Sequence, residues 1–152
     1  MSLNNAAQAG EREIVITRVF DAPREMVFDA WTDEEQLSKW WGPRGFTSTF
    51  QKFDMMPGGT WEFIMHGPDN VDYPNMHVIV EVVHLERIVF KHAVFSHFMA
   101  TVCFEDLDGK TKLTYRTVFE ETEAVFDKVK KYAVPGAEQT MDRLAELLAN
   151  NT

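Results

Sequence analysis

The amino-acid sequence predicts an α+β domain in which helices cover one face of an antiparallel β-sheet. Three observations predict this class: one strand followed by two helices, then six strand-like segments in succession, then a helical C-terminal stretch. Short connections make successive strands antiparallel neighbours, and the apolar stripe of a helix must bury against a sheet face. A long antiparallel sheet curls as it twists. We therefore expect a space between sheet and helix, lined by aromatic side chains.

The N-terminal third predicts one strand and two short helices. Residues 13–20 are rich in β-branched and apolar side chains, which favours a strand. Pro23 suits the first position of a helix, because its missing N–H has no partner to lose there. Thr32 and Glu35 have the spacing of a capping box, which predicts that a second helix begins there. The pair 42–43, Gly-Pro, predicts its end.

The middle of the chain switches to strand patterns separated by turn residues. In residues 108–109, Asp-Gly between two alternating runs is typical of a tight hairpin turn. The predicted strands are residues 46–53, 60–66, 76–83, 87–94, 98–105 and 111–119.

The C-terminal stretch has apolar residues at helical spacing in two segments, 121–132 and 137–150. Between them stand Val134, Pro135 and Gly136. Since proline and glycine both disfavour a helix interior, we expect an interruption there.

Composition excludes several classes of function. Lys and Arg total 15 and Asp and Glu total 24, a net charge of −9 without a dense basic cluster. A nucleic-acid partner is therefore not expected, because such proteins neutralise phosphates with clustered cations. No stretch approaches the roughly 18 apolar residues of a membrane span, and residues 1–10 lack the pattern of a signal peptide. We expect a cytoplasmic protein with a disordered or tag-derived segment at 1–10 and a single domain at 11–152.

Chemistry-bearing residues are present without a convincing catalytic or metal-binding pattern. The single cysteine, Cys103, lies in a strand-like run and favours a sheet position over a reactive thiol. No nucleophile-elbow motif surrounds any serine. The histidines show no paired spacing on a helix, and we interpret them as surface or cavity-rim residues. We expect no metal, no cofactor and no catalytic residue. The five histidines are His66, His77, His84, His92 and His97.

Six short blocks, in order along the chain, carry a resemblance to a known family. They are Thr17–Pro23, Lys39–Pro43, Met56–Trp61, Glu81–Val83 with Glu86–Val89, Gly109–Thr114, and Met141–Ala145. The chain resembles homologues of the activator of the heat-shock protein 90 ATPase, within the START-like (SRPBCC, helix-grip) superfamily of lipid and polyketide binders. The resemblance implies a seven-stranded antiparallel sheet wrapped around a long C-terminal helix, with two short helices between strands 1 and 2. It also implies an internal cavity for a hydrophobic or aromatic molecule.

This chain departs from the family pattern at three places. His84 and Leu85 stand where the family usually has two prolines, and His77 stands where glycine is frequent. Ala137 replaces an aromatic residue near the start of the last helical segment, which we expect to widen the mouth of the cavity.

Candidate ligand-binding residues are the aromatic and adaptable side chains expected on the inner face of the sheet and helix. Pockets for small molecules are mainly apolar with a few polar groups, so Tyr115 and Thr117 are candidate polar contacts. The expected cavity residues are Trp40, Trp41, Trp61, Phe63, Met65, Phe90, Phe104, Tyr115, Thr117, Met141 and Leu144.

Three functions follow as hypotheses. The first is a non-catalytic carrier or sensor of a lipid- or polyketide-like molecule, with a stress-related role. The second is an enzyme like polyketide cyclases or aromatases, which would need an acid or base such as Tyr115 with His92 or Arg116. Arg116 should face away from Tyr115 in a regular strand, which counts against that group. The third is a chaperone-associated interaction protein. We do not expect chaperone stimulation, and homodimer formation stays open.

Overall fold

The computed structural model describes residues 12–93 and 97–150. The expectation for residues 1–10 lies outside the described residues. The elements are β1 (Glu13–Phe20), α2 (Arg24–Thr32), α3 (Glu34–Trp40), β2 (Thr47–Phe53), β3 (Thr60–His66), β4 (Asp72–Val83), β5 (Arg87–His92), β6 (Phe98–Leu107), β7 (Lys110–Phe119) and α4 (Glu123–Asn150).

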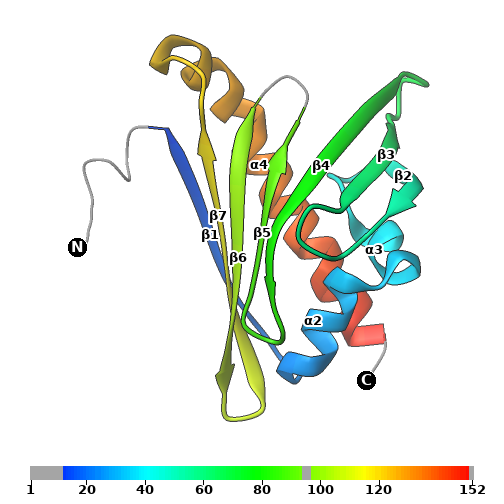
Figure 1. The fold of residues 1–152 in the computed structure, drawn as a ribbon, viewed down its shortest axis with the longest axis vertical. Helices are drawn as coiled ribbons and strands as arrows, with labels where there is room; N and C mark the ends of the chain where they lie inside the picture. The colour runs from blue at the N-terminus through cyan, green and yellow to red at the C-terminus, as the bar shows by residue number, and fades with distance from the viewer. Residues whose placement is uncertain (1–11, 94–96, 151–152) are drawn as a thin grey trace.

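The seven strands form one antiparallel sheet in the order β1-β7-β6-β5-β4-β3-β2. Every pair except β1 with β7 joins strands that follow one another in the chain, as their short connections require. The sheet curves around α4, which runs diagonally across its inner face, while α2 and α3 lie beside the C-terminal half of α4 (Figure 1). The predicted α+β class, with two short helices between β1 and β2, is confirmed.

The predicted interruption of the C-terminal helix is wrong. Residues 123–150 form one continuous helix of 28 residues, and Pro135 lies inside it. Phe126 before the proline and Met141 and Leu144 after it are all buried against the core. Packing on both sides therefore holds the helix together across a residue that removes one backbone hydrogen bond.

The predicted capping box is also wrong. Thr32 is the last residue of α2, and its hydroxyl donates to the Phe28 carbonyl oxygen at 2.9 Å. Asp33 alone separates the two helices and occupies the N-cap of α3 without a side-chain cap bond. Pro23 is the N-cap of α2, whereas the sequence pattern predicts it at the first helical position. Because α2 continues through Thr32, the hydroxyl has a carbonyl of its own helix within reach.

Five strand boundaries differ from the prediction, those at Thr47 and Lys110 by one residue and the others by two or more. Strand β4 begins at Asp72 instead of residue 76, and it pairs with β3 as far as His66. Strand β6 continues to Leu107, directly before the Asp-Gly turn. The extension of β4 matters for the site because it places Asn75 inside the paired region opposite Phe63.

The hydrophobic core is densely aromatic at the end covered by α2 and α3. The Trp31 and Trp40 rings meet edge to face with centroids 4.8 Å apart, and both side chains are fully buried. Phe104 of β6 contacts both Phe28, at 5.2 Å, and Trp31, at 6.4 Å. Trp40 Nε1 donates to the Ala30 carbonyl oxygen at 3.0 Å, so this indole keeps its hydrogen bond inside the core.

Candidate ligand-binding cavity

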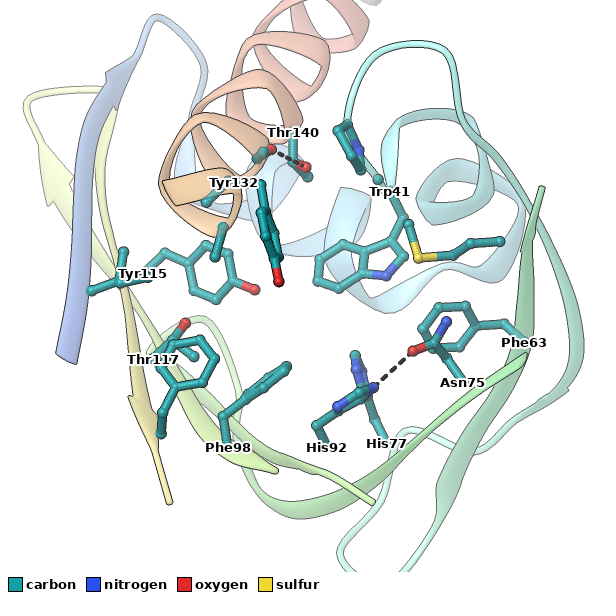
Figure 2. A pocket seen from close by; sticks show the side chains of 18 residues that line it. Trp41, Phe63, Asn75, His77, His92, Phe98, Tyr115, Thr117, Tyr132 and Thr140 are labelled. Carbon is teal, nitrogen blue, oxygen red and sulfur yellow. Dashed lines mark hydrogen bonds between the residues drawn. The ribbon is translucent and has the colours of Figure 1, made fainter. Parts of the chain in front are cut away.

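A cavity of about 310 Å³ lies at the other end of the core, between the sheet, α4 and the loop after α3 (Figure 2). Its walls are mainly apolar, with a few polar groups, as is usual for small-molecule sites. The lining residues are Ile14, Trp41, Gly42, Pro43, Phe63, Met65, Asn75, His77, His92, Phe98, Tyr115, Thr117, Phe119, Tyr132, Ala133, Gly136, Ala137 and Thr140.

An aromatic row runs across five strands and forms the floor of this cavity. The strand registers pair Trp61 with His77, His77 with His92, His92 with Phe98, and Phe98 with Phe119. Residues directly opposite on neighbouring strands share one face of the sheet, so all five rings point inward. Four of the five, all but Trp61, line the cavity.

The two histidines of this row are held by stacking. The His77 ring stacks on Phe90 with centroids 4.6 Å apart, and the His92 ring stacks on Phe98 at 4.7 Å. The two imidazoles meet edge to face at 5.1 Å. Trp41 approaches His77 from the loop after α3, with centroids 5.9 Å apart.

Helix α4 leaves room for the cavity by placing small residues over it. Ala133, Gly136 and Ala137 line the helix side. A Cβ at Gly136 would come no closer than 3.9 Å to Pro43, its nearest neighbour there. Tyr132 also belongs to the lining but is 68% exposed, so it marks the solvent side of the cavity.

His77 is buried and has an unpartnered ring nitrogen, which is unusual for a polar side chain of this wall. Its side chain is 2% exposed, and Nδ1 is enclosed without a hydrogen-bond partner. Burial lowers the pKa of His77 well below its ordinary 6.5, and the nearby His92 adds to this effect. Loss of water disfavours the charged imidazolium, so the ring is neutral at physiological pH.

His92 and Asn75 form a hydrogen-bonded pair beside His77. His92 Nε2 lies 2.7 Å from Asn75 Oδ1, and Asn75 Nδ2 donates to the Tyr73 carbonyl oxygen at 2.8 Å. Because the amide nitrogen already donates to a carbonyl, Oδ1 is the acceptor and His92 Nε2 carries the proton. The pair fixes the His92 ring against the lining.

Tyr115 and Thr117 supply polar groups on the β7 wall. Burial raises the pKa of the Tyr115 phenol to about 12, and a hydrogen bond with Thr117 partly offsets this shift. The phenol is therefore neutral at every physiological pH. Its hydroxyl turns toward the interior of the cavity (Figure 2).

Charged side chains are missing from the lining given above. Arg143, which lies outside this lining, donates to backbone carbonyls of the loop that carries Trp41. Within residues 12–93 and 97–150, no three His, Cys, Asp or Glu side chains gather as metal ligands.

The structure divides the predicted cavity residues into two groups. Trp41, Phe63, Met65, Tyr115 and Thr117 line the cavity. The other six are buried in the core outside the lining: Trp40, Trp61, Phe90, Phe104, Met141 and Leu144. They face inward as predicted, and Trp40 and Phe104 lie at the end of the core where α2 and α3 fill the space with their own side chains.

Sequence reasoning missed the polar floor of the cavity. The interpretation of the histidines as surface or rim residues is wrong for His77 and His92, which are both buried. Alternation was the available signal: His77 stands two residues before Ile79, and His92 two residues after Phe90, so each shares the inward face. Arg116 does face outward, where it forms an ion pair with Glu13 at 2.9 Å.

A curved seven-stranded antiparallel sheet around a long C-terminal helix, with an apolar cavity between them, defines a START-like protein of helix-grip fold. The chain belongs to the family of activator of Hsp90 ATPase homolog 1-like proteins, whose model matches residues 21–149. The resemblance found in the sequence blocks is thereby confirmed.

Solved structures from several bacteria share this fold. A solution structure from Arthrobacter aurescens aligns with a TM-score of 0.87 at 23% identity, covering 98% of this chain and 91% of that one. A crystal structure from Nitrosomonas europaea gives 0.85 at 22% identity, covering 93% and 97%. One from Mycobacterium smegmatis gives 0.82 at 26% identity, covering 93% and 94%. A search of curated proteins found no match.

In the part of the chain that the structure describes, no helix combines the length and the apolar character needed to cross a bilayer.

Proposed function

We propose that this protein binds a compact hydrophobic or aromatic small molecule in the cavity and acts as a non-catalytic carrier or sensor. The observation that carries the proposal is the 310 Å³ apolar space between the sheet and α4. Proteins of START-like fold commonly bind hydrophobic ligands. Burial of apolar surface supplies the affinity of such a site, and the few polar groups set orientation.

The size of the cavity favours a ring compound over a long-chain lipid. An apolar cavity of about 150 Å³ holds one benzene ring. A space of about 310 Å³ therefore suits a molecule of about two fused rings.

The electrostatics of the lining favour binding over catalysis. A general acid or base works best when its pKa lies near the operating pH. Here the pKa of Tyr115 is raised to about 12 and that of His77 is lowered well below 6.5. Both shifts move the pKa of the group away from pH 7 and leave the group uncharged.

Native mass spectrometry of the purified protein tests the proposal. The protein is then denatured and extracted into organic solvent. We expect an added mass that is released as a free small molecule. Ala137→Phe fills the cavity from α4 and should abolish the adduct. Ala124→Phe is the matched control, because Ala124 is exposed on the same helix and lies outside the lining.

Two outcomes would contradict the proposal. An adduct that persists in Ala137→Phe would place the bound molecule elsewhere. A wild-type protein that carries no adduct and responds to no member of a panel of aromatic and fatty molecules would indicate that the space is not a binding site.

A cyclase-like enzyme is the second candidate, because Tyr115 and His92 share one cavity. Incubation of the extracted molecule with wild type and with Tyr115→Phe distinguishes it. Turnover to a product of changed mass or absorbance, lost in the variant, would favour the enzyme.

A further inference from the structure

The unpartnered nitrogen of His77 determines how this ring meets a ligand. Nδ1 is sealed from solvent and has no hydrogen-bond partner. The neutral ring carries a single proton, on Nδ1 or on Nε2. An orphaned N–H inside a protein is rarer than an under-used acceptor, so the proton is disfavoured on Nδ1. The tautomer with the proton on Nε2 leaves an unused lone pair at Nδ1 instead.

Nε2 is consequently the polar atom that His77 offers to the cavity. Trp31 Nε1 and His77 Nδ1 are the enclosed, unpartnered side-chain atoms among the described residues, and Nε2 is not among them. Since His77 lines the cavity, its Nε2–H is a hydrogen-bond donor on that wall. Stacking on Phe90 and the approach of Trp41 hold the ring in this position.

Tyr115 offers a second neutral donor from a different wall. Burial raises the pKa of Tyr115 to about 12, so its phenol keeps the hydroxyl proton. A neutral phenol hydroxyl can donate one hydrogen bond to a ligand. Figure 2 shows the β7 wall with Tyr115 and Thr117 across the cavity from the wall that carries His77.

We propose that His77 Nε2–H and the Tyr115 hydroxyl recognise a neutral ring compound through its carbonyl oxygen. This inference rests on the proposed function and adds the chemical class of the ligand. Two donors call for an acceptor on the ligand, and a lining without charged side chains disfavours an anion, which would lose its hydration without a counter-charge. A ketone carbonyl on a fused-ring skeleton satisfies both requirements and fits the volume.

The test compares two bicyclic molecules of almost equal shape, 1-tetralone and tetralin, by isothermal titration calorimetry. Tetralin lacks the carbonyl and is the more hydrophobic, so apolar burial alone ranks it first. One net hydrogen bond contributes about 0.5–1.5 kcal/mol, so we expect 1-tetralone to bind about threefold to tenfold more tightly. In the double variant His77→Phe/Tyr115→Phe the preference should reverse in favour of tetralin.

A spectroscopic measurement on the wild-type protein makes the test independent of how the variants fold. The carbonyl carbon of ¹³C-labelled 1-tetralone should move downfield on binding, relative to its position in cyclohexane, because hydrogen-bond donation polarises the carbonyl. The shift should be lost in the double variant. His84→Phe and Tyr73→Phe are the matched controls and should retain it, since neither residue lines the cavity.

The failures of the two proposals are distinguishable. Tetralin binding as tightly as the ketone, with an unshifted carbonyl signal, would overturn the carbonyl inference and leave an apolar binding site. If neither molecule binds, the carbonyl inference falls, and the adduct and ligand-panel measurements decide separately on the proposed function. A shift that survives in the double variant would also overturn the inference, because other donors would then be responsible.

Discussion

Arg143 Nη1 donates to the Gly42 carbonyl oxygen at 2.8 Å and thereby ties α4 to the loop that follows α3. The same guanidinium donates to the carbonyls of Pro43 at 3.2 Å, Phe46 at 3.1 Å and Lys39 at 3.0 Å. Two sequence blocks about a hundred residues apart meet at this point. Gly42 and Pro43 also line the cavity, so one side chain holds a part of its wall.

We expect Arg143→Met to lower the free energy of unfolding by about 2–3 kcal/mol. The substitution leaves several partly buried carbonyls without a charged donor, and each such hydrogen bond contributes about 1.5–3 kcal/mol before the loop relaxes. Urea denaturation measures the change. Arg44→Ala is the control and should cost less than Arg143→Met, because Arg44 pairs with Glu146 on the exposed surface, where ion pairs contribute little. Equal losses in both variants would refute a special role for Arg143.

The stability of the protein should fall below pH 6.5 because of His77. The unfolded chain binds a proton near the ordinary pKa of 6.5, whereas burial keeps the folded ring neutral to a lower pH. The unfolded state therefore binds more protons between these two pKa values. Stability is fully present above pH 6.5 and decreases as the pH falls, by up to about 1.4 kcal/mol per pH unit.

Replacement of His77 by Phe should remove this part of the pH dependence. The new ring is of similar size and joins an aromatic cluster, so at pH 7 the variant should lie within about 1.5 kcal/mol of wild type. Denaturation curves from pH 7.5 to 5 measure the slope. His97→Gln, an exposed position, should keep the wild-type slope. An unchanged slope in His77→Phe would contradict the burial argument.

Two glycines of the cavity lining should respond to alanine in opposite directions. Gly136 lies inside α4 with space around it, so Gly136→Ala should stabilise the protein by about 0.5–1 kcal/mol through helix propensity. Gly42 has a φ of 112°, and a Cβ there would lie 2.9 Å from Met65 Cε. Gly42→Ala should destabilise by about 1–2 kcal/mol or more. Thermal unfolding of the two variants gives both signs, and a loss of stability in Gly136→Ala would show that the helix is strained there.

Element order was predictable where a turn has an unambiguous composition. Asp108 and Gly109 predicted the β6–β7 hairpin, and both adopt positive φ angles, 52° and 90°. The continuity of α4 was not predictable from local rules. Proline disfavours a helix locally, whereas the packing of Phe126, Met141 and Leu144 acts over the whole element.

The composition of the cavity was only partly predictable, for a reason that lies in the register. Alternation along a strand indicates which side chains face inward, but not which inward residues on different strands become neighbours. His77 and His92 meet only because β4 and β5 pair in one particular register, with a shift between Ile79 and Glu81. Alternation also does not reveal how far α2 and α3 fill the core. For this reason the position of Phe104 beneath these helices, outside the cavity, was not predicted.

The pairing of β1 with β7 has a consequence for how the protein is made. Glu13 lies opposite Val118, so the first strand finds its partner only after a hundred further residues have been synthesised. Contacts of such large sequence separation slow folding, because the entropy of chain closure is lost before the contacts stabilise the chain. Helix α4, which supplies the roof of the cavity, leaves the ribosome later still. During synthesis the cavity can therefore close only after the whole sheet and α4 have been made, and the nascent chain exposes its aromatic floor until then.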